Sequence, residues 1–104
     1  MPNSTTNKLT GVISTDSTAQ TVVIFPKPTT HLQLVCDDGG SGGFVFNEIN
    51  SATIDSTGSS SNAVPASGIA SPIVGSREIG TLTLLASTAN CKYYIEAFKR
   101  FGGN

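Results

Sequence analysis

The sequence predicts an all-β protein, a single antiparallel β-sandwich of immunoglobulin-like or jelly-roll type with about 7 to 8 short strands. Segments in which apolar and polar residues alternate recur along the chain, and turn-forming residues separate them at intervals of about ten residues. No segment of ordinary helix length shows a helical period. Of the 104 residues, 26 are Ser or Thr and 12% are charged, a composition that suits strands better than helices rich in Glu, Lys, Ala and Leu.

The alternation is clearest in the last third of the chain, in segments 80–86 and 91–98. A short polar turn, 87–90, joins them, and we therefore expect a β-hairpin. A hairpin by itself is barely stable in water, so the earlier segments should supply the strands that complete its sheet and cover its apolar face. The side chains expected on that face are Leu82, Leu84 and Ala86 in the first segment and Cys91, Tyr93, Ile95 and Ala97 in the second.

Two strands are expected near the start of the chain, at 9–14 and 20–25. The second strand is apolar on both faces, so we expect one face in the core and the other against a neighbouring subunit. Pro26 and Pro28 end this strand, because proline cannot donate a hydrogen bond to a sheet.

A second hairpin is expected from segments 31–36 and 44–49, which flank the glycine-rich turn 37–43. The alternation places side chains on a common face in each segment, Leu32, Leu34 and Cys36 in the first and Phe44 and Phe46 in the second.

The middle of the chain is less regular. Residues 50–61 are rich in Ser, Thr, Gly and Asp and predict an exposed loop, with or without a short edge strand. Residues 63–74 are apolar, but Pro65, Gly68 and Pro72 argue against a long helix or a central strand. Short edge strands, or an extended crossover between two sheets, fit this segment best.

A chain of 104 residues is expected to form one domain. We expect the β-sandwich over residues 9–101, a flexible N-terminal arm over 1–8 and a flexible C-terminus over 102–104. No apolar run is long enough to cross a membrane, and the first residues lack the apolar core of a signal peptide, so synthesis in the cytoplasm is expected. The net charge of −1 offers no field to attract nucleic acid or an anionic membrane, and neither is an expected partner.

Cys36 and Cys91 both fall on positions expected to face inward. Buried free thiols are the favoured interpretation, because cytosolic proteins rarely keep disulfides, and a disulfide between two strands is the alternative. Two cysteines and one histidine cannot complete a four-ligand structural zinc site. We therefore expect no metal and no cofactor.

No arrangement of residues predicts catalysis. His31 is the only histidine, no serine lies in a Gly-x-Ser-x-Gly turn, and His31 is expected to be an ordinary surface residue. Asp37 and Asp38 open the glycine-rich turn, which is expected to be flexible, with a weak cation site as the alternative. The basic and aromatic residues near the end are expected to belong to a strand with one solvated face, and a surface that stacks nucleic acid bases is the alternative. These residues are Lys92, Tyr93, Tyr94, Lys99, Arg100 and Phe101.

A family resemblance rests on the order of these segments over residues 9 to 99. The sequence Leu-Gln-Leu-Val lies at 32–35, followed by the glycine-rich turn and by Val-Pro-Ala-Ser-Gly-Ile at 64–69. The closing pair contains Leu-Thr-Leu-Leu-Ala-Ser at 82–87 and Tyr-Tyr-Ile-Glu-Ala at 93–97. In this order the chain resembles the small β-sandwich virion proteins of tailed bacteriophages.

The resemblance implies a non-enzymatic structural protein of the virion, assembled in the host cytoplasm and present in many copies. It would be a capsid decoration or accessory protein, or a small head-to-tail, tail or fibre component, and its partners would be copies of itself and other virion proteins. The resemblance assigns no functional residue.

Our first hypothesis is a homo-oligomer whose assembly surface includes Val22, Val23 and Phe25, because an edge strand invites pairing with another chain. Replacing Val23 with Lys is then expected to break the oligomer and leave the fold intact. The alternative is a carbohydrate-binding module on the same sandwich, with a glycan as ligand. It is the weaker hypothesis because the chain has no Trp, and its two adjacent tyrosines alternate between faces.

Overall fold

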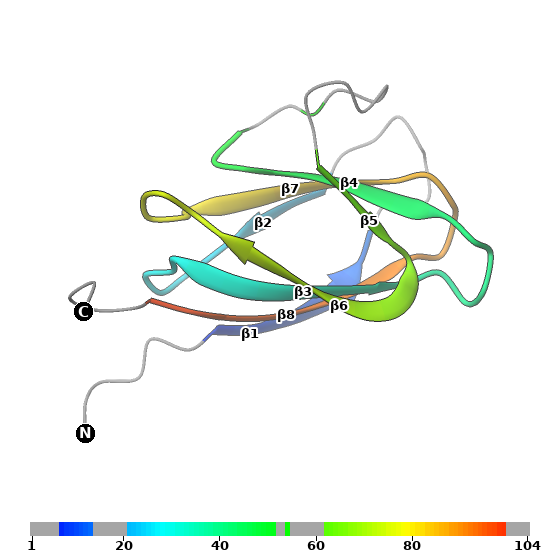
Figure 1. Ribbon diagram of the computed structural model, residues 1–104, viewed down its shortest axis with the longest axis horizontal. Helices are drawn as coiled ribbons and strands as arrows, with labels where there is room; N and C mark the ends of the chain where they lie inside the picture. Colours follow the sequence, from blue (N-terminus) through cyan, green and yellow to red (C-terminus); the bar gives the residue numbers. More distant parts are fainter. Residues whose placement is uncertain (1–6, 14–20, 52–53, 55–61, 100–104) are drawn as a thin grey trace.

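The computed structural model describes residues 7–13, 21–51, 54 and 62–99, which form eight strands in two antiparallel four-stranded sheets (Figure 1). The two sheets lie face to face with the core between them. This confirms the predicted all-β sandwich. The strands are β1 (Asn7–Val12), β2 (Thr21–Ile24), β3 (His31–Asp37), β4 (Phe44–Ile49), β5 (Asn62–Pro65), β6 (Ser67–Val74), β7 (Thr81–Ala86) and β8 (Lys92–Phe98).

The strand order identifies the type of sandwich. Sheet A has the order β1-β8-β3-β6, and sheet B has the order β2-β7-β4-β5. The first strand thus pairs with the eighth, the second with the seventh, the third with the sixth and the fourth with the fifth. This nesting is that of a jelly roll, a long folded ribbon of strand pairs rolled into two sheets. Of the two sandwich types left open by the sequence, the jelly roll is therefore the one that forms.

Neither of the two hairpins predicted from the sequence forms, although the strands predicted for them exist. β7 lies in sheet B and β8 in sheet A, so residues 87–91 carry the chain across the sandwich. β3 and β4 are separated between the sheets in the same way, with residues 38–43 as the connection. The physical reason is that alternation determines which side chains face the core, but it does not select the neighbouring strand.

The apolar segment 63–74 forms edge strands, as its proline residues indicate. β5 is the edge of sheet B, β6 is the edge of sheet A, and Ala66 between them is buried where the chain changes sheets. Edge strands on either side of a crossover between sheets are therefore confirmed, although β6, with eight residues, is longer than the short strand expected. Within the described ranges, β4 and β5 are the one pair of consecutive strands in the same sheet. The predicted loop 50–61 connects them, and apart from residues 50, 51 and 54 it lies outside the described residues.

In each of the long alternating segments, the side chains of one face pack in the core. The faces predicted for these segments are confirmed. The core side chains that they supply are Leu32, Leu34 and Cys36 from β3, Leu82, Leu84 and Ala86 from β7, and Cys91, Ile95 and Ala97 from the last segment, with Tyr93 packed against them. Phe44 and Phe46 do share a face, which is the outer face of sheet B, because Val45 between them is buried.

Strand β2 corrects the expected assembly surface. Val23 is 5% exposed and Phe25 is also buried, and both belong to the core. Val22 is 45% exposed and Ile24 is 70% exposed. Because successive residues of a strand point to opposite faces, only Val22 of the three predicted residues is available to a partner, and Ile24 is its neighbour on that face. Val23→Lys would place an ammonium group in the core instead of on the surface.

The N-terminal boundary of the domain also differs from the expectation. Asn7 and Lys8, assigned to a flexible arm, belong to β1. The buried Asn7 side chain donates from Nδ2 to Thr29 Oγ1 at 2.8 Å and accepts from the Lys27 backbone N–H at 3.2 Å. These bonds tie β1 to the segment that follows β2. The rest of the expected arm, and the expected C-terminal segment 102–104, lie outside the described residues.

Candidate functional site

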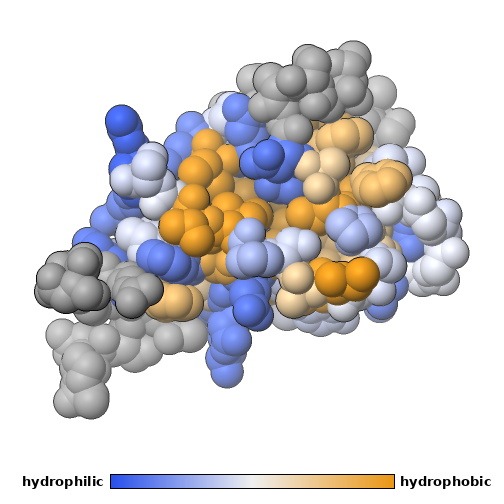
Figure 2. All heavy atoms as spheres, viewed as in Figure 1, coloured by the Kyte–Doolittle hydropathy of each residue, from blue (hydrophilic) through white to orange (hydrophobic). Residues whose placement is uncertain are grey.

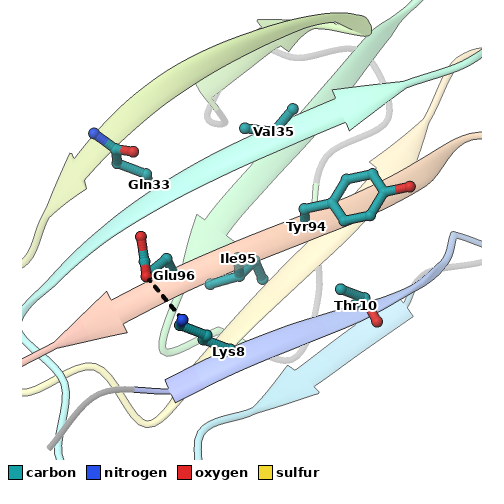
Figure 3. Close-up of a pocket in the computed structure, with 7 residues that line it drawn as sticks. All are labelled: Lys8, Thr10, Gln33, Val35, Tyr94, Ile95 and Glu96. Atoms are coloured by element: carbon teal, nitrogen blue, oxygen red, sulfur yellow. Dashed lines mark ion pairs between the residues drawn. The ribbon is translucent and has the colours of Figure 1, made fainter.

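A hollow of about 300 Å³ lies on the outer face of sheet A (Figure 3). Three neighbouring strands, β1, β8 and β3, form it. We call it the sheet A groove. Its lining residues are Lys8, Thr10, Gln33, Val35, Tyr94, Ile95 and Glu96.

The strand register explains why residues so far apart in sequence meet here. Two rows of side chains cross the sheet, with the central strand β8 in the middle of each row. Because residues two apart on a strand point the same way, both rows lie on the outer face. The first row is Lys8, Glu96 and Gln33, and the second is Thr10, Tyr94 and Val35.

Tyr94 is the aromatic residue of the groove. Its side chain is 47% exposed, and Figure 3 shows its ring on one side of the hollow and the pair of Lys8 and Glu96 on the other. Ile95 between them also lines the hollow, but its side chain is buried in the core and points away from this face. The groove therefore combines an exposed ring, the neighbouring apolar side chain of Val35 and a polar rim.

The charges of the groove cancel. Lys8 Nζ lies 3.7 Å from Glu96 Oε2, and both side chains are largely exposed. An exposed pair of this kind contributes about 0–1 kcal/mol to stability, so its two groups can reorient toward a ligand at little cost. Among the described residues, the side chains of Thr10, Gln33 and Tyr94 form no hydrogen bond with another part of the protein. Their polar atoms are free to meet a ligand.

A second hollow of about 360 Å³ lies beyond Tyr94, which lines both. Asp37 and Lys92, neighbours across β3 and β8, line it together with Asp38, Gly39 and Asn90. Tyr94 therefore stands between two adjoining hollows on one face of the sheet.

Asp38 anchors the glycine-rich turn beside that second hollow. Its carboxylate accepts hydrogen bonds from the backbone N–H groups of Gly40, Ser41 and Gly43, at 3.1, 2.9 and 2.8 Å. It also accepts one from Thr88 Oγ1 at 2.7 Å. The bond from Thr88, followed by those from the backbone, lowers the pKa of Asp38.

This arrangement revises the interpretation of the turn. Instead of a freely flexible segment, the turn has its backbone bonded to Asp38, and Gly39, Gly40 and Gly42 supply the positive φ angles that its path requires. In the described part of the chain no three His, Cys, Asp or Glu side chains gather into a group that could hold a metal ion.

The two cysteines are buried free thiols that form no disulfide, in agreement with the favoured interpretation. Burial, together with the neighbouring Cys91, raises the pKa of Cys36 to about 12. Burial also raises the pKa of Cys91. Because the nucleophile in cysteine chemistry is the thiolate, both side chains are inert near neutral pH.

The remaining candidate functional residues do not form a common site. His31 stacks on Phe98, with 5.3 Å between ring centres, and its Nδ1 lies 2.7 Å from Thr30 Oγ1. Lys99 pairs with Glu78 at 3.4 Å. Lys92, Tyr93 and Tyr94 lie in β8, which has one solvated face as expected, because Tyr93 packs against the core and Tyr94 points outward. Arg100 and Phe101 lie outside the described residues.

No protein family, curated protein or solved structure matches this chain. The arguments for its function therefore depend on its own geometry. Among the described residues there is no helix able to span a membrane. Sequence reasoning missed the groove because its polar residues come from three strands whose neighbours could not be predicted. The available signal was the outward position of Gln33 and Tyr94 in their alternating segments.

Proposed function

We propose that this chain is a non-enzymatic structural virion protein of a tailed phage, either a capsid decoration or accessory protein or a small head-tail or tail component. It acts through contacts with copies of itself and with other virion proteins. The observation that supports this most directly is the outer side of β2, where Ile24 is 70% exposed and Val22 45% exposed. β2 is the edge of sheet B, so one side of its backbone has no partner strand among the described residues.

The physical case for self-association has two parts. An edge strand with exposed β-branched side chains can pair with another chain and bury apolar surface at once. The net charge of −1 adds little repulsion between copies. The partner of β2 in this proposal is a second copy of the chain.

The edge of sheet A can be compared with the β2 edge of sheet B. β6 is the edge of sheet A, and its Ile69 and Val74 are also exposed. Figure 2, which shows the side of the molecule with β5 and β6 in front, shows apolar side chains gathered along this strand. The two edges can therefore be tested separately.

The side chains capable of catalytic chemistry are buried, hydrogen-bonded or stacked within the fold, which supports a role without catalysis. The thiols of Cys36 and Cys91 are buried, the carboxylate of Asp38 is bonded to its own turn, and His31 is stacked on Phe98.

The first test is the solution mass of the protein, measured by light scattering over a concentration series. We expect an oligomer that persists at low micromolar concentration and that Ile24→Lys converts to a monomer. Val74→Lys, a matched change on the other edge, should leave the mass unchanged. A monomer at every concentration contradicts the self-associating form of the proposal. Dissociation by Val74→Lys alone moves the interface to β6.

The virion role has its own test. Mass spectrometry of phage particles purified from a culture that expresses this chain should detect it in fixed proportion to the major capsid protein. Its absence from intact particles would overturn the proposal.

A further inference from the structure

We propose that the sheet A groove binds a neutral oligosaccharide, with one sugar ring stacked beside Tyr94. This inference goes beyond the assembly role and does not depend on it, because the groove lies on the outer face of sheet A and the proposed interface on the edge of sheet B. It develops the carbohydrate-binding alternative into a defined site.

The aromatic ring is the first argument. A pyranose ring has a face of C–H groups that packs on an aromatic side chain, and Tyr94 offers an exposed ring at the centre of a sheet. Val35, its neighbour on β3, extends the apolar surface. Binding sites for small molecules commonly combine such a surface with a few placed polar groups.

The polar rim is the second argument. Each sugar hydroxyl can donate and accept a hydrogen bond, so a site for it needs both kinds of partner. The amide of Gln33 offers donors and an acceptor, Glu96 offers acceptors, and Lys8 offers donors. Within the described chain the Thr10, Gln33 and Tyr94 side chains have no competing hydrogen bond. A ligand would therefore displace water from them and not a protein group.

Charge and size define the class of sugar. Lys8 and Glu96 neutralise each other at 3.7 Å, so the groove favours neither a polyanion nor a polycation. A volume of about 300 Å³ lies at the lower end of the range for small-molecule sites and suits one sugar unit. The second hollow, of about 360 Å³ on the other side of Tyr94, gives room for the next unit. Asp37 and Asp38 outnumber Lys92 in that second hollow, so it does not favour an anionic unit either. The occupant is therefore an oligosaccharide of at least two units without negative charge.

The test is an NMR titration of the ¹⁵N-labelled full chain with a panel of neutral disaccharides, namely maltose, cellobiose, lactose, chitobiose and mannobiose. Each is added to about 10 mM, which is sufficient to detect millimolar binding. We expect at least one sugar to shift the backbone signals of the two rows that form the groove. No shift with any member of the panel, or shifts confined to another surface, would overturn the proposal.

Variants separate stacking from a general loss of structure. Tyr94→Ala should weaken binding at least about tenfold, and Tyr94→Phe should retain most of it. Phe98→Ala is the matched control. Phe98 is 45% exposed on the outer face of the same strand, but it lies outside the groove, so affinity should not change. Equal losses for Tyr94→Ala and Phe98→Ala would refute the assignment.

A charged probe tests the neutral character of the ligand. A sulfated disaccharide and a short single-stranded DNA are titrated under the same conditions. We expect neither to shift the groove signals as strongly as the best neutral sugar. Tighter binding of either would overturn the assignment to a neutral sugar and indicate a polyanion.

Discussion

At the scale of single residues, Asp38 shows how one carboxylate organises a connection between sheets. Residues 38–43 leave β3 in sheet A and enter β4 in sheet B. The donors that surround the carboxylate come from this turn and from Thr88 in another crossing segment, 87–91. One side chain thus links two of the connections that cross the sandwich, and an ionised acceptor strengthens each of these bonds.

The pH dependence of stability follows from the lowered pKa of Asp38. The folded protein binds a proton at this site less readily than the unfolded chain, whose ordinary pKa is 3.8. The stabilising contribution is therefore present above that pH and is lost as the pH falls through the lowered pKa. We expect Asp38→Asn to be less stable than the wild type at neutral pH, with a gap that closes in acid.

Urea unfolding between about pH 7 and pH 2, across the range of a shifted carboxyl group, measures this gap. Asp37→Asn is the control, since the Asp37 carboxylate accepts a bond from the Gly39 N–H at the exposed side of the turn. A gap that stays constant with pH would show that the charge of Asp38 does not hold the turn.

At the scale of elements, β2 shows what composition leaves undecided. Its last three residues are all aliphatic and β-branched, so their side chains alone do not distinguish the core face from the outer face. The register with β7 makes the distinction. Val23 lies opposite Leu82, which belongs to the core, whereas Ile24 lies opposite Thr81.

Adjacent alanine substitutions on β2 test this orientation. Val23→Ala should lower the free energy of unfolding by about 1–3 kcal/mol, because it removes two buried methyl groups and leaves a cavity. Ile24→Ala should change it by no more than about 0.5 kcal/mol, because the side chain is mostly exposed. Urea unfolding at a concentration where the protein is monomeric gives both values. The reverse order would mean that the strand faces the other way.

At the scale of the whole molecule, the two outer faces differ. On sheet B, Thr83 and Leu85 point outward from β7 but are buried. The Thr83 hydroxyl donates to the carbonyl of Ser51, and Ile54 is buried apart from the main core. Ser51, which follows β4, thus contacts the outer face of sheet B, whereas the middle of sheet A presents Tyr94 to solvent. This difference is why the candidate ligand site lies on sheet A.

The nested strand order also predicts slow folding. β1 pairs with β8, β2 with β7 and β3 with β6, so most of the sheet forms only after long segments of chain have closed. Loop closure costs entropy before these contacts provide stabilisation. We expect a main folding phase on the order of milliseconds to seconds. Stopped-flow circular dichroism after dilution from urea measures it.

A brief unfolding step before refolding separates that phase from proline isomerisation, which takes tens of seconds or longer. Folding in microseconds would be inconsistent with a transition state that contains the β1–β8 pairing.

The sequence by itself determined most of the strands and, in the clearly alternating segments, their buried faces. The expected strand 44–49 coincides with β4, and the alternation in 80–86 and 91–98 identified the core side chains correctly. These features are local, because the period of two along a strand and the breaks at Pro and Gly depend on neighbouring residues.

Only the tertiary structure decided which strands are neighbours. Segments 80–86 and 91–98 both read as halves of a hairpin, yet they lie in opposite sheets. The groove follows from the same decision, since Lys8, Gln33 and Tyr94 meet only because β8 lies between β1 and β3. Strand partners are selected by the packing of the whole core and by the closure of long segments of chain, and no short stretch of sequence contains that information.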